Sequence, residues 1–143
     1  MIPDFLSAIV DTLLPGDDDP PQLPTGTAAG VAARLAAHLV ARRDSARLEA
    51  VLAAIASAAR GEDAFVRAGA AERVATLRGV EAEMRGPFRA LVALVLEDYY
   101  EAETVLLAMG WRTEPPQPQG HALSPPVDEA LLEPVRRRSR MWR

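Results

Sequence analysis

Residues 86–111 read GPFRALVALVLEDYYEAETVLLAMGW, the most apolar stretch of the sequence. Gly86 ends the preceding element, and Pro87 suits the first turn of a helix because no amide hydrogen is needed there. The run from Pro87 to about Tyr100 is apolar on nearly all sides, which is typical of a helix buried in a core. Glu101–Met109 either continues this helix or forms a short separate one, with Gly110 well placed as its cap. We expect this stretch to be the central helix of the fold.

Amphipathic segments precede this helix and predict a bundle around it. Their apolar residues recur at intervals of three and four, which is the period of a helix, and Pro or Gly residues separate several of them. Sustained period-two alternation is missing, so we expect no β-sheet. The predicted elements are Pro3–Leu14, Ala28–Arg43 after a cap at Thr25 or Thr27, a helix capped by Asp44 or Ser45 and stopped by Gly61, a short turn at Glu62–Arg67 that holds Phe65, and Ala70–Met84. The predicted fold class is all-α, a small helical bundle of about five or six helices within a domain that spans residues 1–110.

The character of the sequence changes after Gly110. Six residues between positions 115 and 134 are prolines, which favour extended backbone over packed helices. Residues 111–143 also carry bulky apolar side chains that a solvated linker seldom needs, namely Trp111, Leu123, Val127, Leu131, Leu132, Met141 and Trp142. A flexible linker is one interpretation of such a tail. We prefer the other, in which residues 111–143 form a long, Pro-rich, extended C-terminal arm that binds a partner.

The composition fits one domain with a modest core. Apolar residues make up 49% of the 143 residues but aromatic residues only 5%, and the abundant alanines bury little area each. Such a core points to support from a partner. The net charge of −4 argues against general nucleic-acid binding, although residues 134–143 carry five arginines and no acid.

Several classes of site and of targeting segment find no support in the sequence. Cysteine is absent, which excludes disulfides and iron–sulfur ligation in this chain. No apolar run approaches the roughly 20 residues that span a bilayer. Met1–Leu14 lacks the basic start of a signal peptide, so we do not expect it to act as one.

The residue types that carry chemistry in enzymes do not form a recognisable site. Residues 26–30 match neither the phosphate-binding loop nor the dinucleotide fingerprint. His38 lies beside an apolar helical stripe without a metal-ligating partner one turn later, so we interpret it as a structural or interface histidine. Asp17–Asp19 are interpreted as a solvated turn, with a divalent-cation site as the alternative. A stand-alone enzyme that uses the carboxylates between Glu97 and Glu103 is a rival hypothesis. On a helix these are neighbours on a solvated face, so we predict no catalytic, cofactor-binding or metal-binding residues.

Aromatic, apolar and basic residues instead predict a protein interface. Tyrosine and tryptophan combine a large contact area with a polar group and concentrate in interfaces, and arginine is also suited to them. The predicted partner-interface residues are Tyr99, Tyr100, Trp111, Leu131, Leu132, Arg136, Arg138, Met141 and Trp142. The alternative is an adaptor that binds a membrane surface or another protein through the Arg-rich C-terminus.

Short motifs towards both ends of the helical region resemble one known family. Residues 11–17 read DTLLPGD, residues 98–100 read DYY, and residues 105–111 read VLLAMGW, with PPQPQG at 115–120. In these motifs the chain resembles the gluconate 2-dehydrogenase subunit 3 family, in which a tyrosine-bearing helix leads to a Gly-aromatic step and a Pro-rich exit. The resemblance covers both ends and the general helical middle of the chain.

The resemblance implies a function that the residues alone do not show. Members look like small, non-catalytic, chaperone-like subunits of flavin-dependent sugar or polyol dehydrogenases, which help the large subunit to mature and remain soluble. That large subunit is of the glucose–methanol–choline type and holds FAD, and a multihaem cytochrome c often accepts its electrons. The resemblance thus implies no cofactor in this chain, FAD in the partner and haem c in a third subunit where one exists. Arg42-Arg43 is internal and is no export signal. The compartment therefore stays open between the periplasm, reached with a signal-bearing partner, and the cytoplasm.

Overall fold

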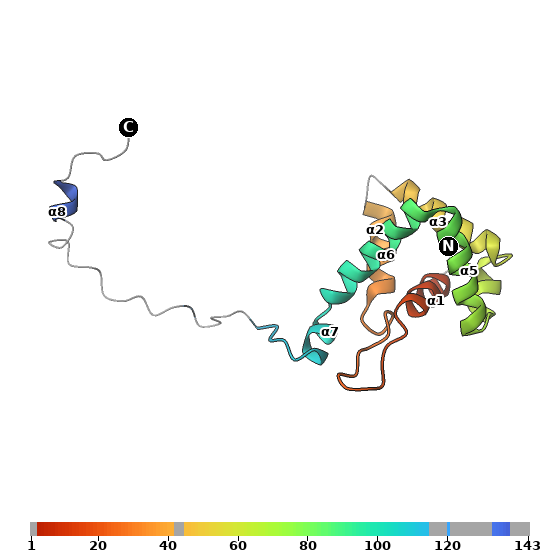
Figure 1. Ribbon diagram of the computed structural model, residues 1–143, viewed down its shortest axis with the longest axis horizontal. Helices are drawn as coiled ribbons and strands as arrows, with labels where there is room; N and C mark the ends of the chain where they lie inside the picture. The colour runs from red at the N-terminus through yellow and green to blue at the C-terminus, as the bar shows by residue number, and fades with distance from the viewer. Residues whose placement is uncertain (1–2, 42–44, 115–119, 121–132, 138–143) are drawn as a thin grey trace. The chain divides into compact units, whose positions relative to one another are not determined.

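α-Helices are the only regular elements in the residues that the computed structural model describes, which are 3–41, 45–114, 120 and 133–137 (Figure 1). The elements are α1 (Pro3–Leu13), α2 (Val31–Ala41), α3 (Ser45–Ala58), α4 (Glu62–Arg67), α5 (Ala70–Glu83), α6 (Arg85–Tyr100), α7 (Glu103–Ala108) and α8 (Glu133–Arg136). The all-α class is confirmed for these residues, with seven helices up to residue 108. Every described helix is too short or too polar to span a bilayer.

The chain divides into two units, Met1–Thr113 and Glu114–Arg143. The first unit extends past α7 because the chain turns back along that helix. The amide of Trp111 donates a hydrogen bond to the carbonyl of Leu106 at 2.9 Å, and Thr113 Oγ1 donates to Glu103 Oε1 at 3.1 Å. Within the described part of the second unit, α8 is the only helix. The geometry of the predicted extended arm lies largely outside the described residues, and its binding to a partner stays a prediction.

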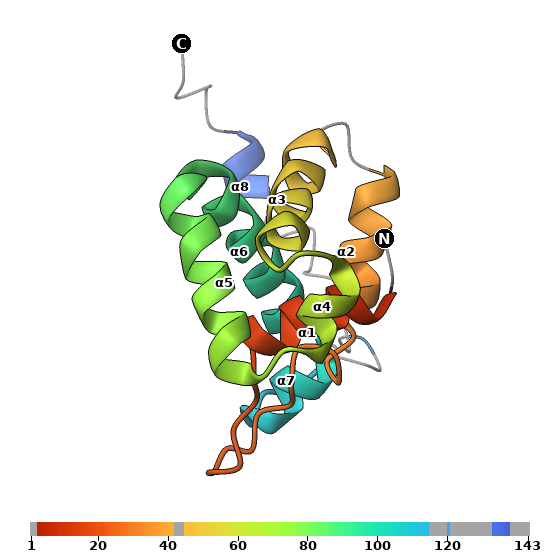
Figure 2. The same ribbon diagram turned by 90° about the vertical axis from the view of Figure 1, so that its right-hand side faces the viewer.

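The expected central helix is α6, which packs against α2, α3, α5 and α7 (Figure 2). Its buried face is mostly apolar and includes Phe88, Leu91 and Val95, which lie three and four residues apart. The expectation that this helix is buried on all sides is wrong, because Ala93 is exposed and Leu96 is 37% exposed. Alanine and a single leucine count as apolar in a sequence, yet they are tolerated at a surface. The helix is therefore amphipathic.

Phe65 anchors the short helix α4 in the core, where the sequence predicted a short turn that holds this residue. Its ring meets Phe5 of α1 edge to face, with centroids 5.6 Å apart, and both side chains are fully buried. Arg73 of α5 lies over the Phe65 ring, with its guanidinium carbon 5.9 Å from the centroid. The same guanidinium donates to the carbonyl of Phe65 at 3.0 Å and to that of Val66. Arg73 thus binds two carbonyls at the C-terminal end of α4, of which that of Phe65 also accepts a hydrogen bond from the amide of Ala68 at 3.2 Å.

The long loop between α1 and α2 is tied down along α1. The amide of Gly26 donates to the carbonyl of Leu14 at 3.0 Å, and the amide of Thr27 donates to Asp11 Oδ1 at 2.7 Å. Gly26 has no room for a side chain, because a Cβ at this position would overlap Val10 and lie 3.2 Å from Leu14 Cβ. These contacts tie the far end of the loop back to the C-terminal half of α1.

Local hydrogen bonds and backbone angles set the ends of α2 and α7. Thr25 Oγ1 accepts a hydrogen bond from the amide of Ala28 at 3.2 Å. A threonine cap is therefore present, but it holds a turn, and α2 starts at Val31 instead of Ala28. After α6 the chain follows the second predicted alternative, because Ala102 is extended (φ −70°, ψ 127°) and α7 is a separate helix. Gly110 follows it with φ 77°, as expected of a glycine cap.

Candidate partner interface

Large apolar and aromatic side chains are exposed where α6 ends and α7 follows. Tyr100 is 51% exposed, Leu107 55%, Met109 41% and Trp111 63%. Single apolar residues on a surface are common, whereas a concentration of them marks a surface that binds another protein. Tyr100 and Trp111, both predicted at the interface, are accessible to a partner. We call these four residues the α7 apolar end.

Tyr99, the third aromatic residue predicted at the interface, lies inside the bundle of α1 to α7, which we call the helical body. It is only 3% exposed, and its hydroxyl donates to the carbonyl of Pro24 at 2.7 Å. Its ring meets that of Tyr100 edge to face, with centroids 5.5 Å apart. Burial, and to a lesser extent the neighbouring Tyr100, raise the pKa of Tyr99 above its ordinary value. Tyr99 therefore fixes the α1–α2 loop to α6 and offers almost no surface to a partner.

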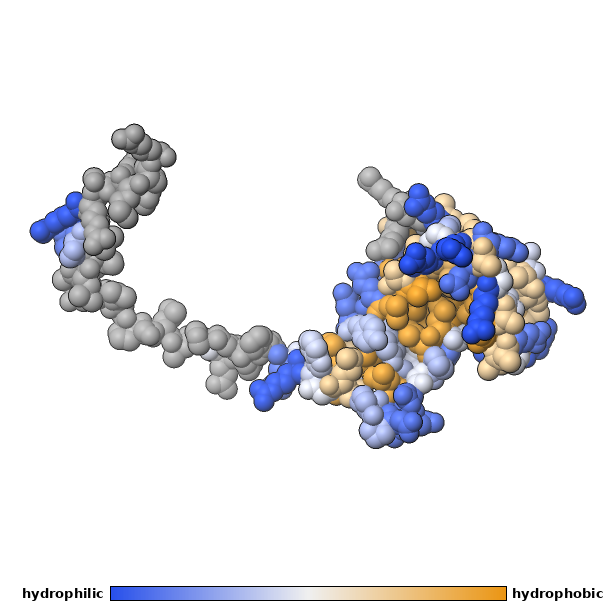
Figure 3. Space-filling model, in the orientation of Figure 1, coloured by the Kyte–Doolittle hydropathy of each residue, from blue (hydrophilic) through white to orange (hydrophobic). Residues whose placement is uncertain are grey.

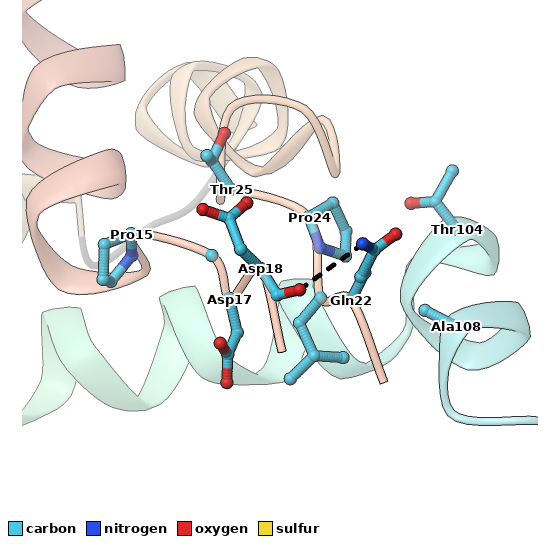
Figure 4. Close-up of a pocket in the computed structure, with 10 residues that line it drawn as sticks. Pro15, Asp17, Asp18, Gln22, Pro24, Thr25, Thr104 and Ala108 are labelled. Atoms are coloured by element: carbon cyan, nitrogen blue, oxygen red, sulfur yellow. Dashed lines mark hydrogen bonds between the residues drawn. The ribbon is translucent and has the colours of Figure 1, made fainter. Parts of the chain in front are cut away.

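A pocket of about 500 Å³ lies between the α1–α2 loop and α7 (Figure 4). Thr104 and Ala108, one turn apart on α7, line it from one side. The loop lines it from the other, where Gln22 Nε2 donates to the carbonyl of Asp18 at 3.4 Å. Leu107 lies about one turn after Thr104 on the helix surface, so the pocket adjoins the α7 apolar end.

The aspartates of this loop are arranged as a turn. Figure 4 shows the carboxylates of Asp17 and Asp18 pointing in different directions. Asp17 Oδ1 accepts a hydrogen bond from the amide of Asp19 at 2.9 Å, as aspartate side chains do in turns. Within the described part of the chain, no three acidic or histidine side chains are placed to hold a metal ion. The hydrogen bond between Asp17 and Asp19 supports the turn interpretation.

Charge is distributed unevenly over the helical body. Residues 1–33 and 90–111 carry nine acidic residues and no arginine, whereas residues 34–89 carry ten arginines and seven acids. The first two ranges contain α1, the α1–α2 loop, the end of α6 and α7. The end of the body that holds the pocket and the α7 apolar end is therefore acidic. Such a surface favours a positively charged partner segment.

A histidine–aspartate pair joins α2 to α6, and the sequence did not reveal it. His38 Nε2 lies 3.2 Å from both carboxylate oxygens of Asp98, which is 6% exposed. Arg34, one turn before His38, donates from its guanidinium to the carbonyl of Asp98 at 3.0 Å. Sequence reasoning grouped Asp98 with exposed carboxylates, although its position three residues after the buried Val95 places it on the buried face. The interpretation of His38 as a structural histidine is confirmed.

Two carboxylates of the rival enzyme hypothesis are not arranged as a catalytic pair. Glu97 and Glu101 are both exposed and lie one turn apart. Acid–base pairs of carboxylates work when their surroundings differ, and these two share the same solvent.

The remaining predicted interface residues belong to the second unit. Arg136 is exposed on α8, where Arg137 Nε lies 3.4 Å from Glu133 Oε2 one turn earlier. The other predicted contacts, which lie outside the described residues, are Leu131, Leu132, Arg138, Met141 and Trp142. Their role at an interface stays a prediction.

Comparison with known proteins gives one match. The family model described as gluconate 2-dehydrogenase subunit 3 matches residues 3–115, which include all of α1 to α7. No curated protein and no solved structure matches the chain. The matched range contains the α1–α2 loop, the pocket and the α7 apolar end.

Proposed function

The chain belongs to the gluconate 2-dehydrogenase subunit 3 family, and we propose that it is the small, non-catalytic subunit of an FAD-dependent sugar or polyol dehydrogenase complex. In this proposal the chain stabilises the large flavoprotein subunit, which holds FAD and oxidises the substrate. Where a cytochrome subunit is present, its haem c accepts the electrons. The activity of the complex then resides in the partner.

The observation that carries the proposal is the α7 apolar end. Leu107 and Trp111 expose more than half of their surface, at 55% and 63%. Covering such side chains with a partner contributes roughly 25 cal/mol for each Å² of apolar surface that leaves water. The surface around the α7 apolar end also has a pocket, which gives it shape, and acidic residues, which give it charge. These features support a subunit that works by binding.

Producing the large flavoprotein subunit with and without this chain tests the proposal. We expect the flavoprotein to be soluble, loaded with flavin and active when both chains are present, and to aggregate or lose flavin when it is produced alone. The isolated chain should show no turnover of sugars or polyols with an artificial electron acceptor.

A matched pair of variants connects this test to the surface. A chain with Leu107→Ser and Trp111→Ser should lose most of its ability to keep the flavoprotein soluble. Val40→Ser should retain it, because Val40 is 90% exposed on α2, away from α7. Turnover by the isolated chain, or a flavoprotein equally soluble and active without it, would contradict the proposal.

A further inference from the structure

A second apolar surface lies where α1, α5 and α6 meet. A pocket of about 170 Å³ opens between these helices, and its lining includes Leu13, Val74 and Phe88. This volume is several times the roughly 30 Å³ that one water occupies in the liquid. The pocket therefore has room for one bulky apolar side chain from outside.

An apolar stripe continues from this pocket along α6. Phe88, Val92, Leu96 and Tyr100 follow one another at intervals of one turn, so they run down one side of the helix. Exposure increases along the stripe, from 4% at Phe88 through the half-buried Val92 to 37% at Leu96 and 51% at Tyr100. At a rise of 1.5 Å per residue the stripe is about 18 Å long, which matches about three turns of another helix.

Figure 3 shows this surface as a hydrophobic patch over α1 and α6, bordered by hydrophilic side chains. A contiguous apolar patch with a polar border is typical of a surface that binds another protein. The stripe ends at Tyr100, which also belongs to the α7 apolar end. The two apolar surfaces are therefore continuous at this residue.

The two ends of the stripe differ in charge. Near the pocket, both signs of charge are present, because the chain carries Glu81 and Glu83 between Arg78 and the pair Arg85 and Arg89. Beyond the other end, the α1–α2 loop and residues 90–111 contain acidic side chains and no arginine. A partner segment that covers the whole stripe therefore meets acidic side chains together with arginines at the pocket end, but acidic side chains without arginine at the Tyr100 end. Charge complementarity of this kind selects a partner and fixes its direction.

We propose that this surface, the α1/α5/α6 groove with the stripe along α6, binds an amphipathic helix of the large flavoprotein subunit. One bulky apolar side chain of that helix fills the pocket, its apolar face covers Val92 and Leu96, and basic residues lie at the end near Tyr100. This inference rests on the proposed function, because it names the surface with which the subunit holds its partner.

Titration of the full chain against the purified large flavoprotein subunit tests the groove. Leu96→Asp places a charge at the centre of the stripe and should weaken binding by about tenfold or more. Val40→Asp places the same charge on an equally apolar position that is 90% exposed on α2, and it should leave the affinity unchanged. Equal thermal unfolding midpoints for both variants show that neither loses its fold.

A second substitution addresses the pocket without adding charge. Val74, which is 36% exposed, lines the pocket from α5, so Val74→Trp fills it and keeps the surface apolar. The affinity should again fall by about tenfold, because the side chain of the partner no longer enters. An unchanged affinity would overturn the proposed insertion.

A charge variant tests the direction of the helix. Asp17→Asn, Asp18→Asn and Asp19→Asn together keep the hydrogen-bond acceptors of the turn but remove its charge. Association should become several-fold slower at low salt, and the difference from the unaltered chain should vanish at high salt, where such interactions are screened. Asp63→Asn on α4, away from this end, should change neither rate, and an unchanged rate for the loop variant would overturn the orientation.

The results of these experiments distinguish a failure of the groove proposal from a failure of the proposed function. If the unaltered chain does not bind the flavoprotein, the proposed function fails. If it binds and Leu96→Asp binds equally well, the groove proposal alone is overturned. If the chain forms a dimer by itself that Leu96→Asp converts to monomers, the occupant is a second copy of this chain and the proposal is also overturned.

Discussion

Single polar contacts hold the apolar helices of the body in place. The hydroxyl of Tyr99 reaches from α6 to the carbonyl of Pro24, and His38 reaches from α2 to the carboxylate of Asp98. Each contact joins residues at least 60 positions apart in the sequence. A buried polar group without a partner is costly, so both contacts are expected to affect stability more than exposed contacts do.

Tyr99 makes the stability of the body depend on pH in the alkaline range. Because the pKa of Tyr99 is raised in the fold, the unfolded chain releases this proton first, at about pH 10. The folded state then binds more protons, so the free energy of unfolding falls as the pH rises through this range. Urea unfolding at about pH 9 and about pH 11 measures the change.

Tyr99→Phe should show a smaller fall in the free energy of unfolding between these pH values. At neutral pH this variant should be less stable by about 1 kcal/mol, because the hydrogen bond to the carbonyl of Pro24 is lost. An equal fall in both proteins would contradict this account.

His38→Ala should destabilise the body by about 1–3 kcal/mol, because it leaves the carboxylate of Asp98 without its side-chain partner. Asp98 is 6% exposed, so water replaces that partner poorly. Glu97→Gln is the matched control, since Glu97 is exposed beside Asp98, and it should change stability by less than about 0.5 kcal/mol. Urea unfolding of both variants measures the difference, and equal effects would show that the pair is not structural.

At the scale of secondary structure, the left-handed residue that closes the end of α3 lies one position before the glycine that the sequence predicted. The sequence predicted that Gly61 stops the helix. In the structure Arg60 already has a left-handed backbone (φ 65°). The amide of Arg60 donates to the carbonyl of Ser57 at 3.0 Å, and that of Gly61 to the carbonyl of Ala56 at 2.7 Å. This closure places an arginine at the position that glycine usually occupies.

Arg60→Gly should therefore stabilise the body by about 0.5–1 kcal/mol, because glycine adopts this conformation without steric cost. Introducing glycine within a helix should have the opposite effect. Ala53→Gly, at an exposed position inside α3, should destabilise by about 1 kcal/mol. Thermal unfolding of the two variants provides the comparison, and a loss of stability in Arg60→Gly would show that another contact of Arg60 outweighs the backbone effect.

The periodicity of apolar residues was sufficient to predict the longer helices, because each one buries a single face, whereas α4 was predicted only as a short turn. It did not predict the exposed side of α6, because Ala and Leu residues occur both in the core and on the surface of proteins. The break at Ala102 has no Pro or Gly to signal it, so it was only one of two alternatives. The pairing of His38 with Asp98 depends on the packing of α2 against α6, which local patterns do not encode.

At the scale of the whole molecule, the first unit combines a helical core with two continuous apolar surfaces and an acidic end. The pocket beside α7 and the pocket between α1, α5 and α6 both open onto these surfaces. The tail that follows contributes further predicted contacts, of which Arg136 is exposed. A chain of this kind is suited to act within a larger assembly, as membership of a dehydrogenase-subunit family implies.

The most direct measurement is the composition of the complex that forms in the native host. The full chain, carrying an affinity tag, is purified from that host, and the eluate is measured by absorbance spectroscopy, mass determination and turnover of sugars or polyols. We predict that a larger protein with a flavin spectrum elutes with the chain in a fixed ratio and that the mixture oxidises its substrate. A chain that elutes alone as a monomer without flavin would contradict the account.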